Sequence, residues 1–146
     1  MAERRIPLLW DVMEVNYQYR MTMTNVFLAD SQPDSRLALR TLVEGLKMNV
    51  VGEAGNWKNL LALVPGSRPD LLLVDWALID SESGATLDQL RAICPDDSAI
   101  VLVSAKNPIE QAALSAGVDA FISRNENVHH VTDRLIKAAS LQNATY

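Results

Sequence analysis

The chain has 146 residues, of which 49% are hydrophobic and 21% are charged, so it fits one ordinary globular domain rather than a disordered or membranous protein. Its net charge of -5 argues against broad, sequence-independent binding to nucleic acid, which requires clustered Lys and Arg. The single cysteine, Cys94, excludes an internal disulfide and is typical of a reducing compartment. Because no stretch reaches the length of a signal peptide or a membrane span, we expect a cytoplasmic protein with no membrane partner.

The N-terminal stretch differs in pattern from the rest of the chain. Its apolar residues at helical spacing predict a short helix near 7–17, docked on the domain or on a second copy. The alternation in 15–23 favours a strand instead, and a native start at Met21 or Met23 would leave the stretch outside the working protein. The domain boundaries we expect are an extension at 1–23, one domain at 24–142 and a tail at 143–146.

From residue 25 onward, strand and helix patterns alternate. Strands are predicted at 25–30, 49–54, 69–76, 99–104 and 120–123, and helices at 33–47, 56–64, 84–93, 108–116 and from about 127 onward. The second helix is expected to end at Pro65, and a polar loop is expected at 77–83. The buried sides of the first and last helices are expected to include Leu37 and Val128. Strict alternation predicts an α/β fold with a doubly wound parallel sheet.

The predicted strand at 69–76 contains four consecutive apolar residues, Leu71-Leu72-Leu73-Val74, which is typical of a central parallel strand buried on both faces. It closes on Asp75, at the edge where ligands bind in open α/β sheets. If three of the strands are central neighbours, Asp30, Asp75 and Ser104 share that edge. Two carboxylates and a hydroxyl suit a divalent cation and a phosphoryl group, and Asp75 is placed as ligand, nucleophile or both.

Six pieces of the chain, in order and spacing, resemble the receiver domain of two-component response regulators. They are Phe27-Leu28-Ala29-Asp30, Val50-Val51-Gly52-Glu53-Ala54, Asp70-Leu71-Leu72-Leu73-Val74-Asp75, Thr86-Leu87-Asp88-Gln89-Leu90-Arg91, Ile100-Val101-Leu102-Val103-Ser104-Ala105 and Ala116-Gly117-Val118-Asp119-Ala120-Phe121-Ile122. The resemblance implies a flavodoxin-like fold with five parallel strands in the order 2-1-3-4-5.

The resemblance also implies a role for individual residues. Asp75 matches the aspartate that accepts the phosphoryl group, and Asp30 matches the first residue of the acidic pair that serves the metal. The backbone carbonyl of Ala77 falls at a metal-ligand position. Ser104 matches the switch hydroxyl that contacts the phosphoryl oxygens, and Phe121 matches the aromatic residue that changes rotamer on activation.

Two positions depart from the family pattern. Ser31 stands where the second acid of the pair, normally a direct metal ligand, is expected, so we predict weak binding of Mg²⁺. Arg124 replaces the lysine that pairs with the phosphate, and its planar fork is bulkier than an ammonium group. Structural roles stay open as alternatives: Asp75 as the ion-pair partner of Arg124, and Asp30 as a turn-forming acid.

The function we expect is that of a stand-alone, non-enzymatic phosphorelay receiver, phosphorylated on Asp75 by a histidine kinase or phosphotransfer protein. Its output would be docking of a downstream protein, or of a second copy, on the face formed by 108–116, 120–123 and the last helix. A pseudo-receiver that signals without phosphorylation is the alternative. A flavodoxin-like nucleotide-binding protein is more remote, because glycine-rich phosphate-binding motifs are missing. A fragment of a DNA-binding regulator is a third alternative, which the acidic balance disfavours, so we expect no nucleic-acid partner.

Overall fold

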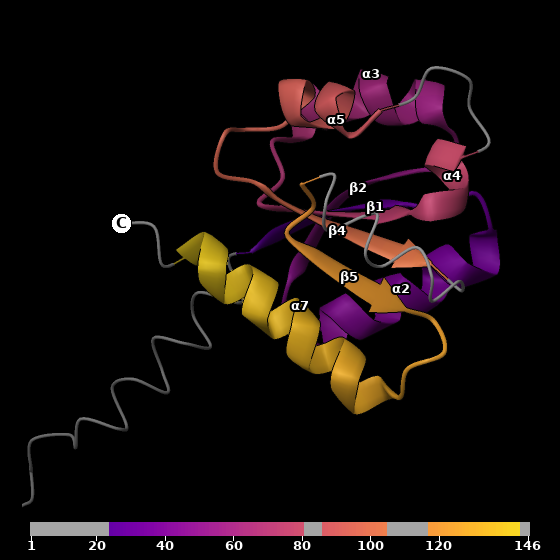
Figure 1. Cartoon of the computed structure of the whole chain (residues 1–146), viewed down its shortest axis with the longest axis vertical. Helices are drawn as coiled ribbons and strands as arrows, with labels where there is room; N and C mark the ends of the chain where they lie inside the picture. The colour runs from indigo at the N-terminus through magenta and orange to yellow at the C-terminus, as the bar shows by residue number, and fades with distance from the viewer. Residues whose placement is uncertain (1–23, 81–85, 105–116, 144–146) are drawn as a thin grey trace, which may run out of the picture.

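The computed structural model describes residues 24–80, 86–104 and 117–143, with side chains for all of these except residue 80 and residues 141–143. Five parallel strands form one sheet in the order β2-β1-β3-β4-β5 (Figure 1), which confirms the predicted doubly wound fold and its strand order. The expected elements at 7–17 and 108–116 lie outside the described residues. The observed elements are β1 (Asn25–Ala29), α2 (Pro33–Gly45), β2 (Asn49–Ala54), α3 (Trp57–Ser67), β3 (Leu71–Asp75), α4 (Trp76–Asp80), α5 (Leu87–Ile93), β4 (Ala99–Ser104), β5 (Ala120–Ser123) and α7 (Val128–Asn143).

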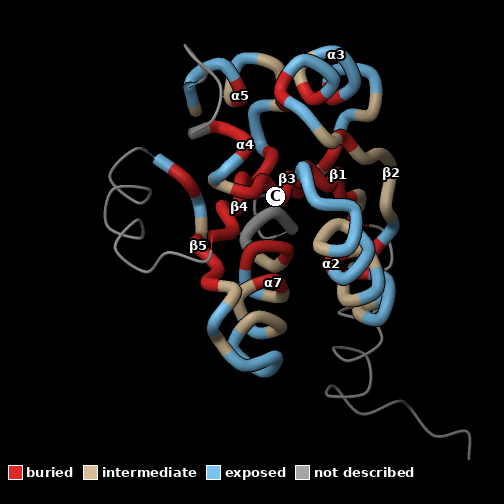
Figure 2. Tube along the Cα trace, turned by 90° about the vertical axis from the view of Figure 1, so that its right-hand side faces the viewer, coloured by how far each residue is buried: buried red, intermediate tan, exposed pale blue. Residues whose placement is uncertain are grey.

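Helices cover both faces of the sheet, with α3 and α5 on one face and α2 and α7 on the other (Figure 1). Alternate side chains of each strand point to opposite faces, so each strand contributes to two apolar clusters. On β3, Leu72 and Val74 join the cluster under α3 and α5, whereas Leu71 and Leu73 join the cluster under α2 and α7. Every residue of β3 is buried, as Figure 2 shows for the centre of the sheet. The predicted burial of this strand on both faces is confirmed.

The segment after β3 is a helical turn rather than the predicted loop. β3 ends at Asp75, and α4 begins at Trp76, which the sequence pattern had placed in the strand. The first turn is supported by the carboxylate of Asp75, whose Oδ1 accepts a hydrogen bond from the backbone N–H of Ala77 at 3.3 Å. Leu78 and Ile79 are buried in the cluster under α3 and α5. Burial of these two side chains favours a helical turn that folds back onto the sheet. The polar residues of this segment had predicted a loop instead.

Two helix boundaries differ from those predicted. Pro65 lies inside α3, which continues to Ser67 instead of stopping at the proline. The helix continues because the carbonyl of Val64 still accepts hydrogen bonds from the Ser67 hydroxyl and the Arg68 N–H. Helix α5 begins at Leu87 rather than near 84, because Thr86 forms a capping box with Gln89. Residue 84 itself lies outside the described residues.

The prediction of the buried faces is correct for the middle of α2 and of α7, but it is wrong at one residue in each helix. Leu37 is 61% exposed and Val128 is 67% exposed. In α2 the sheet-facing positions are Leu39 and Val43, four residues apart, and Leu37 falls on the opposite side of the helix. Val128 is the first residue of α7 and precedes the part of the helix that packs on the sheet, in which Leu135 is fully buried.

Other sequence-based expectations can be compared directly with the described residues. Cys94 is the C-cap residue of α5 and is 6% exposed, so it packs at the end of this helix. Within the described ranges, no helix combines the length and the apolarity needed to cross a bilayer.

Candidate functional site

Three charged side chains meet at the carboxyl edge of the sheet. Asp30 follows β1, Asp75 ends β3, and Arg124 follows β5. The Nη2 atom of Arg124 lies 2.5 Å from Oδ2 of Asp30 and 3.4 Å from Oδ2 of Asp75. Because β4 separates β5 from β3 in the sheet, the long side chain of Arg124 reaches across the end of β4 to make these contacts. The structure thus brings together three residues that are up to 94 positions apart in the chain.

Asp30 is completely buried and has several partners. Its Oδ1 accepts a hydrogen bond from the backbone N–H of Gln32 at 2.9 Å, while its Oδ2 contacts Arg124. Its backbone N–H donates to the carbonyl of Ala54, and its carbonyl accepts from Nη1 of Arg36 at 2.6 Å. Asp30 therefore forms the turn into α2 and also belongs to the charged cluster. The turn-forming role predicted as an alternative for Asp30 is observed, and its role as a metal ligand stays a prediction.

Asp75 is the more accessible of the two carboxylates, with 12% of its side chain exposed. Burial raises the pKa of its carboxyl group, and the neighbouring carboxylate of Asp30 adds to this increase. The positive charge of Arg124 and the hydrogen bond from Ala77 lower the pKa of Asp75 but leave it above its usual range. The negative charge of ionised Asp75 is therefore less fully compensated by its surroundings than its contact with Arg124 alone suggests.

Arg36 supports this edge of the sheet, a role that was not predicted from the sequence. Its guanidinium binds the carbonyl of Asp30 through Nη1 and the carboxylate of Glu53 through Nε, at 2.6 and 3.1 Å. A Cβ at Gly55 would lie 3.1 Å from Nη1 of Arg36, so a larger residue after β2 would require this guanidinium to shift slightly. The available signal was the position of Arg36 in the first turn of the helix after Asp30.

The sequence model of one protein family, the response regulator receiver domain, matches residues 26–136 of the chain. The chain belongs to the response regulator receiver domain family. Its place in phosphorelay signal transduction follows from this membership, and the nucleotide-binding alternative is not favoured. Receiver domains are in general non-enzymatic signalling modules.

Known receiver domains agree with this assignment in sequence and in fold. The chain is 28% identical, over 123 residues, to the KDP operon transcriptional regulatory protein KdpE of Escherichia coli, covering 84% of the chain and 54% of KdpE. It spans about half the length of the curated relatives that it matches. A CheY-like receiver domain from Methanospirillum hungatei has a TM-score of 0.70 at 19% identity, with coverage of 83% and 97%. The chain also resembles a CheX-CheY-BeF3-Mg complex from Borrelia burgdorferi, with a TM-score of 0.67, 15% identity and coverage of 78% and 87%.

The remaining predicted site residues of the receiver domain lie around the charged cluster or on the other face of the sheet. Ser31 and Ala77 are exposed beside the two carboxylates. Ser104 and Phe121 are 3% and 2% exposed. By strand alternation, Ser104 follows Leu102 on the face covered by α3 and α5, where Phe121 also packs. The cluster of Asp30, Asp75 and Arg124 continues the opposite face, so phosphate contact by Ser104 and a switch at Phe121 stay predictions.

Receiver domains generally bind Mg²⁺, which makes the fit of these residues to a metal important. Asp30 and Asp75 offer the oxygen ligands that Mg²⁺ prefers. However, Oδ2 of each carboxylate already contacts Nη2 of Arg124, and Ser31 replaces an acid. Across the described residues, no group of three or more His, Cys, Asp or Glu side chains is arranged to hold a metal ion. With Arg124 in this position, the site does not fit Mg²⁺.

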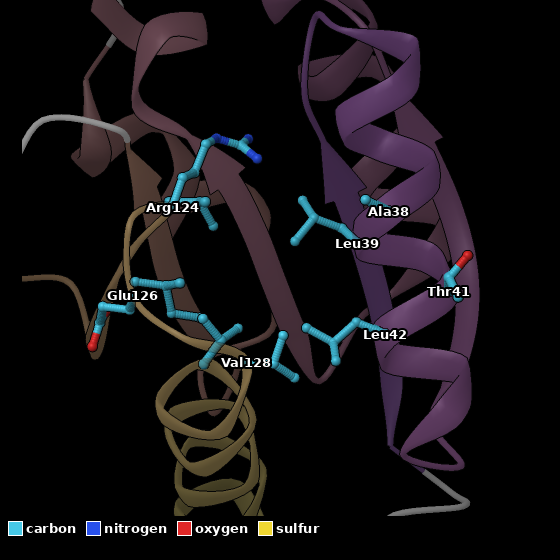
Figure 3. Close-up of a pocket in the computed structure, with 10 residues that line it drawn as sticks. Ala38, Leu39, Thr41, Leu42, Arg124, Glu126 and Val128 are labelled. Carbon is cyan, nitrogen blue, oxygen red and sulfur yellow. The ribbon is translucent and has the colours of Figure 1, made fainter.

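An apolar groove of about 400 Å³ lies beside the charged cluster, between α2 and the start of α7. Figure 3 shows Arg124 at one end of this groove, with its guanidinium directed away from Val128. The groove is lined by Ala38, Leu39, Thr41, Leu42, Val103, Ile122, Arg124, Glu126, Val128 and Val131. Arg124 is thus shared by the charged cluster and the groove.

Proposed function

We propose that this receiver domain accepts a phosphoryl group on Asp75 from a phosphorylated histidine of a kinase or phosphotransfer protein. The observation that carries the proposal is the difference in access between the two carboxylates. Both oxygens of each carboxylate have partners, but the side chain of Asp30 is 0% exposed, whereas that of Asp75 retains 12% exposure at the end of the central strand. Of these two acids, Asp75 is therefore the one that a donor arriving from solvent can reach.

The proposed reaction is a transfer between a nitrogen and an oxygen. A carboxylate oxygen of Asp75 forms a bond to phosphorus, the bond between phosphorus and the donor imidazole nitrogen breaks, and the imidazole leaves with the electron pair and takes up a proton. The aspartyl phosphate that results carries negative charge beside Arg124. The nucleophile must be ionised, and burial raises the pKa of Asp75, so transfer is expected to slow as the pH falls.

We include weak Mg²⁺ binding in this proposal, on the condition that Arg124 leaves the position in which it contacts both carboxylates and in which the site does not fit the ion. The CheX-CheY complex from Borrelia burgdorferi contains magnesium together with BeF3. In this chain the donor set is weaker, because Ser31 stands beside Asp30 where a second acid would supply another negative oxygen. Asp30, Asp75 and the carbonyl of Ala77 are the proposed ligands, with Ser31 as a weak or lost one.

The proposed partners are a histidine kinase or phosphotransfer protein upstream and a docking protein downstream, in the cytoplasm and without a nucleic-acid contact by this domain. The docking face includes β5 and α7, and its expected third part at 108–116 lies outside the described residues. A second copy of the chain is the other proposed occupant of this face. KdpE is named as a transcriptional regulatory protein, so the absence of a nucleic-acid partner stays a prediction for the whole protein.

Intact-mass measurement after incubation with phosphoramidate and Mg²⁺ tests the proposal, because this donor carries the same phosphorus–nitrogen bond as phosphohistidine. We expect wild type to gain one phosphoryl group and Asp75→Asn to gain none. Asp70→Asn is the matched control, because Asp70 precedes the same strand and binds the backbone N–H of Asn25 at the opposite edge. An unmodified wild-type protein, with a known receiver domain modified in parallel, would overturn the proposal.

A pseudo-receiver that signals without phosphorylation is the second candidate. The contact of Arg124 with both carboxylates favours it, because the acids already have a cationic partner within the chain. In that case the same incubation leaves wild type unmodified, and signalling depends on docking alone.

A further inference from the structure

The charged cluster contains two buried carboxylates and one cation that contacts both. Asp30 is completely buried, so its negative charge is unfavourable without a partner of opposite charge. Arg36 also reaches Asp30, but it binds the backbone carbonyl, and its charge is paired with Glu53. Arg124 therefore supplies the positive charge for both Asp30 and Asp75.

We propose that Arg124 is a built-in cation that occupies the acidic site, and that Mg²⁺ binds only when Arg124 leaves Asp30. This inference concerns the binding of Mg²⁺ alone, so it holds whether or not Asp75 is phosphorylated. Only an effect of Mg²⁺ binding on phosphoryl transfer rests on the proposed function. It differs from the expected role of this position, in which the cation contacts the phosphate. Here the guanidinium contacts the two carboxylates themselves.

Arginine is suited to this role by its length and its charge. The side chain must reach from the end of β5 past the end of β4, and the guanidinium stays protonated in any protein environment. The chain has Ser31, which is neutral, beside Asp30, so one arginine faces two acids rather than three. The net charge of this cluster is then -1, which leaves little attraction for a divalent ion.

Competition between the guanidinium and Mg²⁺ follows from their charges. The guanidinium carries one positive charge and Mg²⁺ carries two, so they repel each other when both lie at the carboxylates. Removal of the Arg124 charge is expected to tighten Mg²⁺ binding at least about tenfold, which corresponds to about 1.4 kcal/mol. Because Arg124 also lines the groove beside α2, its departure from Asp30 would alter the end of that groove.

Titration of the full chain with MgCl2 alone, followed by tryptophan fluorescence, tests the proposal, because Trp76 directly follows Asp75. We expect wild type to bind weakly, Arg124→Gln to bind at least about tenfold more tightly and Arg124→Lys to fall between them. Trp76→Phe in the Arg124→Gln background should remove the signal. Arg91→Gln is the matched control, because Arg91 pairs with Asp119 at the other edge of the sheet, and it should bind like wild type.

Thermal unfolding provides a second measurement. Arg124→Gln should melt at a lower temperature than wild type without metal, and Mg²⁺ should raise its melting temperature while leaving wild type nearly unchanged. If Arg124→Gln fails to fold, Arg124→Lys carries the test. Equal Mg²⁺ affinity in wild type and in the soluble Arg124 variants would overturn the proposal. Because no phosphodonor is present, tighter Mg²⁺ binding in the variants supports it even if Asp75 is never phosphorylated.

Discussion

The two edges of the sheet use acidic residues in different ways. At the amino edge, Oδ2 of Asp70 accepts a hydrogen bond from the backbone N–H of Asn25 at 2.8 Å. Oδ2 of Asp119 accepts one from the N–H of Ile100 at 2.7 Å and also pairs with Arg91. Each of these acids satisfies a backbone donor at the beginning of a strand. These hydrogen bonds hold the beginnings of β1 and β4 at the amino edge.

At the carboxyl edge, the acids face each other. Asp30 and Asp75 both contact Arg124, and the proximity of the two carboxylates contributes to the raised pKa of Asp75. At the amino edge each acid holds the N–H of a different strand, whereas at the carboxyl edge two acids share one cation and together retain a net negative charge for a ligand. The comparison indicates why the carboxyl edge is the candidate site although both edges are rich in acids.

The largest expected effect is at Arg124. Arg124→Met should lower the free energy of unfolding by about 3–5 kcal/mol, because breaking a buried ion pair leaves an uncompensated charge. Chemical denaturation at pH 7 measures this loss. Addition of Asp30→Asn should recover part of the stability, because it removes one of the two buried charges. A loss below about 1 kcal/mol would show that Arg124 is not the principal partner of these carboxylates.

A smaller effect is expected at the amino edge. Asp119→Ala should cost about 1–3 kcal/mol of unfolding free energy, because the buried strand residue Ile100 loses the acceptor for its N–H. Its pair with Arg91 is 37% exposed on both sides and adds little. The same variant should keep phosphoryl acceptance and Mg²⁺ binding unchanged. Loss of phosphorylation in folded Asp119→Ala would remove the distinction between the two edges.

The pH dependence of stability should separate Asp75 from the acids of the amino edge. Burial raises the pKa of Asp75 above its ordinary value of 3.8, so between these two values the folded protein binds more protons than the unfolded chain. Stability contributed by this group is therefore present at low pH and lost as the pH rises through the folded pKa. Asp75→Asn should be more stable than wild type at pH 7.

Chemical denaturation of both proteins at several pH values between 4 and 7 measures this difference. The advantage of Asp75→Asn should shrink as the pH falls, because wild-type Asp75 then becomes neutral as well. An advantage that stays constant across the range would contradict a carboxylate at this position with a raised pKa.

The smallest effect is expected in the groove beside the carboxyl edge. Val128 is 67% exposed, so Val128→Ser should change the free energy of unfolding by no more than about 0.5 kcal/mol. Leu135→Ala is the contrast on the same helix, because Leu135 is fully buried, and it should cost about 2–5 kcal/mol. Equal losses would show that the first turn of α7 is packed more tightly than its exposure indicates.

The architecture and the positions of the acids were predictable from the sequence. Unbroken apolar runs predicted β3 and β4, and an acid at the end of a buried strand placed Asp75 at the correct edge. Local patterns were insufficient after β3, where the burial of Leu78 and Ile79 produced a helical turn in a segment that reads as a loop. The same limit applies to Leu37 and Val128, whose apolar side chains are exposed because the sheet lies on the other side of one helix and beyond the start of the other.

The sequence by itself determined the succession of strands and helices along the chain, because hydrophobic periodicity and turn residues act over a few neighbouring positions. It also placed Asp30, Asp75 and Arg124 at strand ends, and it included an ion pair between Asp75 and Arg124 among the alternatives. Only the tertiary structure decided that Arg124 contacts both acids. That arrangement depends on the register of separate strands and on the reach of one side chain across the sheet, which no local pattern contains.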